Sequence, residues 1–132
     1  MAKSLRDAAF PEGISGDIKN EAAKALIQLV RIELLPWSLI EVLSFVTEIV
    51  GAGRLHIDTR QLARDKLFEI ATLSEAEGAR PDVMNALIQG LDRVANQEIF
   101  DQVLRDEAIA HIITIEAIIL NELRRNAYCN AF

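Results

Sequence analysis

The sequence is poor in residues that interrupt helices and in residues that build catalytic or metal sites. Its 132 residues include three prolines, six glycines, two histidines and one cysteine, and only 5% are aromatic. Because Gly and Pro cost about 1 and 3 kcal/mol in a helix interior, their scarcity favours long helices. The lone Cys129 excludes an internal disulfide and fits a reducing compartment. We therefore expect a cytoplasmic, all-α protein.

Basic residues are also outnumbered, since 14 of them face 20 acidic residues and the net charge is −6. This balance argues against nucleic acid as the main ligand and is compatible with a basic protein partner. The first residues, MAKSLRDAAFPEG, lack the apolar core of a signal peptide. The most apolar window of membrane length, residues 34–53, holds Glu41, Glu48 and a proline. We predict a buried helix there and no membrane span.

Apolar residues are plentiful: they make up 51% of the chain, which has a mean hydropathy of +0.18. A domain of this size still exposes roughly a third of its unfolded surface. Another subunit is therefore expected to cover part of the apolar surplus. We expect residues 1–14 to form a tail or a short helix and residues 15–132 to form a single helical domain.

Apolar residues recur with the helical period in five segments, and we detect neither an internal repeat nor the alternation of a strand. Ser38 and Glu41 have the spacing of a capping box at the start of the second segment. The GAG sequence at residues 51–53 predicts a left-handed glycine at its end. Leu62 is expected to point inward. The expected helices cover residues 16–35 (capped by Asp17), 36–50, 59–74 (capped by Asp58 or Thr59), 81–95 and 98–127.

The last segment is the most informative. About 30 residues at a rise of 1.5 Å give a helix of roughly 45 Å, longer than a compact domain needs. From Ala108 to Leu120 this helix is apolar on nearly every side, which indicates burial all round. We therefore predict an orthogonal or up-down bundle of about five helices. Its long, largely buried C-terminal helix is expected to pack against its twin in a helical homodimer.

Three polar residues interrupt this apolar helix: Glu107, His111 and Glu116. Glu107 and His111 are four residues apart, so we expect an ion pair within the helix at the edge of the core. Glu116 points elsewhere and, if buried, requires a partner such as an arginine of the other subunit. Neither histidine lies in a Glu-x-x-His sequence, so a di-iron centre is not supported. No metal and no cofactor is expected.

Two other features bear on binding. Trp37 is expected to plug the end of its own core, with a partner-binding hot spot as the alternative.

The sequence QLARDKLFEIATLSEAEG, residues 61–78, resembles a repressor-type helix-turn-helix, which implies DNA binding. Its turn lacks a glycine, however, and its second helix carries Glu75 and Glu77, which would face phosphates.

Two classes of function remain, with DNA binding a less favoured third. The favoured hypothesis is a non-catalytic helical protein that acts through protein–protein association, as a regulator, an adaptor or an immunity- or antitoxin-like neutraliser. The alternative is a small-molecule-binding or catalytic helical protein with an inter-helix pocket near His111. No catalytic residue is assigned. The candidate ligand- or partner-binding residues are Glu107, His111, Glu116 and Trp37.

Overall fold

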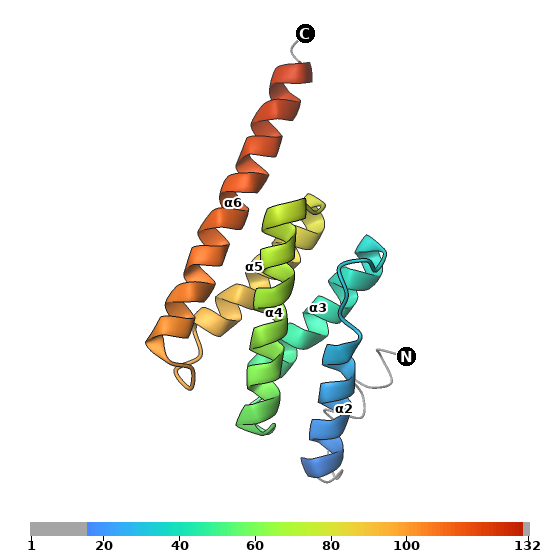
Figure 1. The fold of residues 1–132 in the computed structure, drawn as a ribbon, viewed down its shortest axis with the longest axis vertical. Coiled ribbons are helices and arrows are strands. Elements are labelled where there is room, and N and C mark those ends of the chain that lie inside the picture. The colour runs from blue at the N-terminus through green and yellow to red at the C-terminus, as the bar shows by residue number, and fades with distance from the viewer. Residues whose placement is uncertain (1–15, 131–132) are drawn as a thin grey trace.

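Five helices make up the part of the chain that the structure describes (Figure 1). The computed structural model describes the backbone of residues 16–130 and the side chains of residues 18–127. The side chains of the expected tail at residues 1–14, of the expected cap Asp17 and of Cys129 lie outside this described part. Residues 16–130 contain no strand, so the all-α prediction is confirmed. The helices are α2 (Gly16–Gln28), α3 (Pro36–Val50), α4 (Ile57–Glu77), α5 (Pro81–Ala95) and α6 (Gln102–Asn130).

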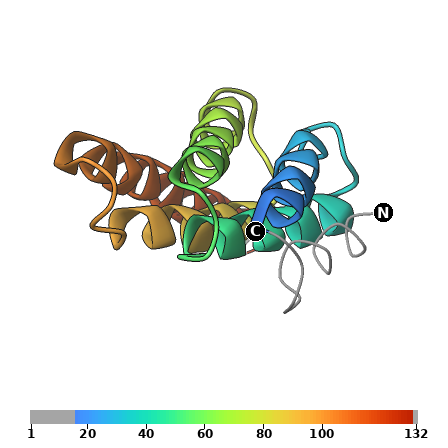
Figure 2. The same cartoon turned by 90° about the horizontal axis from the view of Figure 1, so that it is seen from below.

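The helices are arranged in two layers. Figure 2 shows α2, α4 and α6 in one layer and α3 and α5 in the other. Each helix packs against the next helix along the chain and against the next but one, which lies in its own layer. This is the nearest-neighbour packing of helical repeat proteins, in which each unit contacts mainly the units before and after it.

The α5–α6 pair repeats the α3–α4 pair at an interval of 45 residues. Pro36 opens α3 and Pro81 opens α5, while Ile57 opens α4 and Gln102 opens α6. Two-helix repeats of about 40–47 residues are a known architecture. The sequence hides this repeat because corresponding positions keep apolar character but seldom the same residue. Buried pairs are Leu39 and Met84, Val42 and Leu87, Val46 and Leu91, Ile49 and Val94, Leu55 and Phe100, Ala63 and Ala108, and Ile70 and Ile115.

The repeat extends to the joints between helices, where an arginine caps the preceding helix. Arg60, in the first turn of α4, donates from Nε to the carbonyl oxygen of Val50 at 2.9 Å. Arg105, in the first turn of α6, donates from Nε to the carbonyl oxygen of Ala95 at 3.1 Å. Val50 and Ala95 are the last residues of α3 and α5, whose terminal carbonyls lack partners within the helix. Positive charge is also favourable at that end of a helix.

The end of α2 differs from the prediction. The helix ends at Gln28 and does not continue to Pro36. The amides of Leu29 and Val30 donate to carbonyls three residues earlier, both at 3.1 Å, and so tighten the last turn. The apolar stripe misled the prediction because Val30 is buried although it lies beyond the helix.

The predicted caps differ too. Leu35 is the N-cap of α3 and makes no side-chain capping bond, so Ser38 does not cap this helix. Gly51 has φ −90°, and the left-handed glycine is Gly78, with φ 86°, at the end of α4. Thr59 does not cap α4, because this helix starts two residues earlier and the Thr59 hydroxyl donates to Asn20 Oδ1 at 2.7 Å.

The described helices support neither a helix-turn-helix nor a membrane-spanning helix. Residues 61–78, which resemble a helix-turn-helix, contain no internal turn, because α4 runs without interruption to Glu77. Its outer side includes Leu62, which is 45% exposed and does not point inward. Within residues 16–130, no helix is both long and apolar enough to cross a membrane, as predicted for the window at residues 34–53.

A close approach between helices occurs at Gly90 of α5. A Cβ built there would lie 2.7 Å from Leu67 Cδ2 and 2.8 Å from Thr47 Oγ1. We expect Gly90→Val to lower the free energy of unfolding by about 1–3 kcal/mol, because the buried Leu67 and the half-buried Thr47 would have to shift to admit the new side chain. Gly53→Val is the control, since a Cβ there meets nothing within 4 Å. Urea denaturation measures both; equal stability of the two variants would contradict the close packing.

Candidate functional site

The candidate residues named from the sequence do not form one site. Glu107 and Glu116 are exposed on α6, whereas only 14% of the His111 side chain is exposed. Trp37 is 68% exposed at the start of α3, so the prediction that it plugs the core is wrong. No group of three or more His, Cys, Asp or Glu side chains among the described residues could hold a metal ion.

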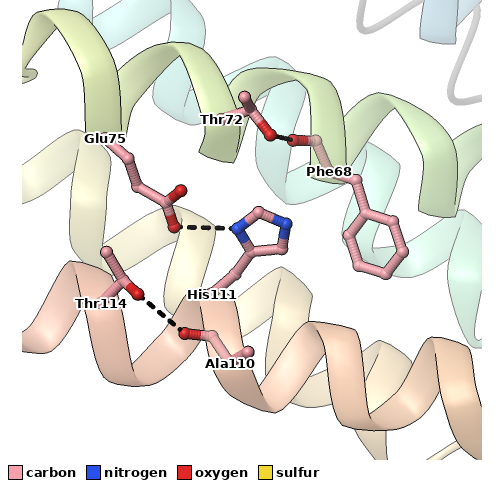
Figure 3. A network of polar contacts seen from close by, with 6 residues as sticks. All are labelled: Phe68, Thr72, Glu75, Ala110, His111 and Thr114. Atoms are coloured by element: carbon pink, nitrogen blue, oxygen red, sulfur yellow. Dashed lines mark hydrogen bonds and ion pairs between the residues drawn. The ribbon is translucent and has the colours of Figure 1, made fainter.

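His111 joins α6 to α4 (Figure 3). Its Nδ1 lies 2.8 Å from Oε1 of Glu75, and because a carboxylate accepts, the imidazole donates from Nδ1. The Phe68 ring lies on the other side of the imidazole, with the ring centroids 5.4 Å apart and the planes 35° from parallel. This spacing is within the range of aromatic pairs. The ion pair expected with Glu107 is therefore replaced by contacts with the neighbouring helix.

The polar side chains around His111 pair with each other or with the backbone. Beside the pair, the hydroxyls of Thr72 and Thr114 donate to carbonyls of their own helices, at 2.9 and 3.0 Å (Figure 3). Two grooves, each about 390 Å³, lie between α2 and α4 and between α5 and α6, and His111 lines neither. His111, Glu75 and Phe68 therefore form a contact between α4 and α6, which we call the His111 joint and which fixes how the two helices pack.

A stripe of side chains on α6, apolar except for Glu116, remains exposed. Leu120 is 48% exposed and Ile113 is 62% exposed, so the predicted burial of α6 on all sides does not hold within one chain. Intervals along the stripe alternate between four and three residues, which is the seam of a coiled coil. We call this stripe the α6 seam. Its members are Ile109, Ile113, Glu116, Leu120 and Leu123.

The 45-residue repeat shows what covers the corresponding face of α4. Phe68 and Glu75 of α4 contact His111 of α6, and Arg64 lies 5.1 Å from the centre of the Phe100 ring in the segment that leads into α6. Arg64 is buried, whereas its counterpart on α6 is 43% exposed. The next unit thus covers this face on α4, and no described residue covers it on α6. The seam residues Ile109, Ile113, Glu116 and Leu120 correspond to Arg64, Phe68, Ala71 and Glu75 of α4.

The seam borders the groove of about 390 Å³ between α5 and α6. Ile88 contributes from α5, and Glu116 is the one carboxylate in the lining. Glu116 makes no ion pair within the described side chains, and it is exposed, so it does not need a buried partner within the chain. The full lining consists of Asn85, Ile88, Glu116, Ile119, Leu120 and Leu123.

The α6 seam was partly visible in the sequence. Glu116 was a candidate residue, but the apolar members of the seam were assigned to a core buried on all sides. Their spacing of four and three residues was the available signal. Which face of an all-round apolar helix stays exposed depends on which neighbours pack against it, and periodicity alone does not specify them.

We expect Glu75→Ala to lower the free energy of unfolding by about 0.5–1.5 kcal/mol, because it removes a half-buried hydrogen bond between α4 and α6. Glu77→Ala, two residues further along α4 at an exposed position, is the matched control and should change stability by less than about 0.5 kcal/mol. Thermal and urea unfolding followed by circular dichroism measure the difference. Equal losses of unfolding free energy in both variants would contradict a stabilising contact between His111 and Glu75.

Comparisons with known proteins add no family to these observations. No protein-family model matches the sequence, and neither a curated protein nor a solved structure was found to match it. The function of this chain is therefore argued from its own residues, and the α6 seam is its most distinctive surface.

Proposed function

We propose that this chain acts without catalysis, through protein–protein association, and that the α6 seam is the contact surface of a homodimer. The observation that carries the proposal is the exposure of four large apolar side chains on one face of α6, where together with Glu116 they follow coiled-coil spacing. Single exposed apolar residues are ordinary on protein surfaces, whereas several large ones gathered on one face indicate an interaction site.

The energetics favour a symmetric partner. Covering a half-exposed Ile or Leu side chain stabilises by roughly 1 kcal/mol. In a two-fold dimer each seam residue is covered once in each copy, so every contribution counts twice. The apolar groove beside the seam adds surface to the same contact through Ile88 and Ile119.

The other classes of function have less support. A ligand pocket near His111 would need polar groups that face an open groove, whereas His111 Nδ1 pairs with Glu75 and His111 lines neither of the two grooves of about 390 Å³. The net charge of −6 remains compatible with a basic partner bound by the dimer, as a regulator, adaptor or antitoxin-like protein would bind one.

Light scattering coupled to size exclusion tests the proposal at low micromolar concentration. We expect the unaltered chain to have twice its monomer mass of 14.7 kDa. Ile113→Lys should shift the population to monomer, because each dimer would bury two unpaired ammonium groups. Leu62→Lys, at an exposed apolar position on α4, should leave the dimer intact. A monomeric unaltered chain would overturn the proposed homodimer.

A further inference from the structure

We infer that a second copy of this chain packs its α6 antiparallel to the first, with the two-fold axis near Leu120. In this arrangement Glu116 of each copy lies beside Arg124 of the other. The inference rests on the proposed function, and it adds the direction, the register and the charge pairing of the contact.

The spacing of side chains along α6 suits this register. An antiparallel alignment centred on Leu120 places Leu123 opposite Ala117 of the second copy and Ile113 opposite Ala127. All five residues are exposed in the single chain. Large residues therefore meet small ones on both sides of the axis, which lets two helices approach closely without voids.

The charges on the seam disfavour two competing arrangements. A parallel pair places Glu116 beside the same residue of the second copy, and so does an antiparallel pair centred on Glu116. Two carboxylates with no cation between them repel each other. The register centred on Leu120 instead places Glu116 beside Arg124, eight residues further along the same side of the helix. Neither side chain makes an ion pair within the described residues, and both are exposed.

The reach of α6 beyond the other helices supports the same arrangement. Figure 1 shows the C-terminal part of α6 extending past α3, α4 and α5. Residues 120–127 are all exposed in the single chain. In the proposed register, residues 117–124 of the second copy lie along the α6 residues that line the groove with α5. Each protruding segment thus covers the groove of the other copy.

Disulfide trapping distinguishes the registers. In a Cys129→Ser background, Leu120→Cys should form a covalent dimer under mild oxidation, because the two residues meet at the axis. Ile113→Cys should not, because the two cysteines would lie about 14 residues apart along the helices, roughly 21 Å, beyond the reach of a disulfide. A parallel dimer would trap both variants.

The outcomes separate this inference from the proposed function. A chain that is dimeric by light scattering but is not trapped by Leu120→Cys, or is also trapped by Ile113→Cys, overturns the antiparallel register. Association through α6 then stands if Ile113→Lys still shifts the population to monomer. A monomeric chain overturns both. Trapping at Leu120 alone supports both.

Charge reversal provides a second test on the full chain. We expect Glu116→Arg and Arg124→Glu each to raise the dimer dissociation constant by about tenfold, because each change turns two attractions into two repulsions. The double variant should restore the original value, since it re-forms both pairs with the charges exchanged. Additive weakening in the double variant would overturn the pairing of Glu116 with Arg124.

Discussion

The structure depends on one constraint: a unit of two helices cannot bury its apolar faces alone and needs the next unit of the stack to cover them. The α3–α4 unit meets this requirement, because α5 and α6 pack against it. The α5–α6 unit has the same period and shares many of the buried core positions, but no described residue covers the outer side of α6. The exposed α6 seam is therefore a consequence of the repeat and not an isolated irregularity.

Several polar contacts join distant segments of the chain, and they fix how the apolar faces of the helices meet. Asn20, which is 2% exposed on α2, accepts from the backbone amide of His56 and from the hydroxyl of Thr59 at the start of α4. Arg60 caps α3 and also donates to Gln97 in the segment between α5 and α6. These bonds are directional, whereas apolar contacts tolerate sliding, so they set the register of the stack.

His111 is one of these polar residues that join two helices. His111 lies where α4 and α6 meet, and its ring is held between Glu75 and Phe68 (Figure 3). A site for chemistry would leave such a group open to a ligand, whereas here its described contacts come from the neighbouring helix. The residues that stay available for a partner are instead the apolar members of the α6 seam, with Glu116 and Arg124 as the charges beside them.

The sequence by itself determined the helical class, the starts of α3 and α5 at Pro36 and Pro81, and the length and apolar character of α6, because these depend on local propensity and periodicity. Only the tertiary structure decided the early end of α2, the exposure of Trp37 and the pairing of His111 with Glu75. It also revealed the 45-residue repeat, which keeps apolar character at the shared core positions but seldom the same residue. Contacts between distant segments decide which face of an apolar helix is covered, and no local pattern encodes them.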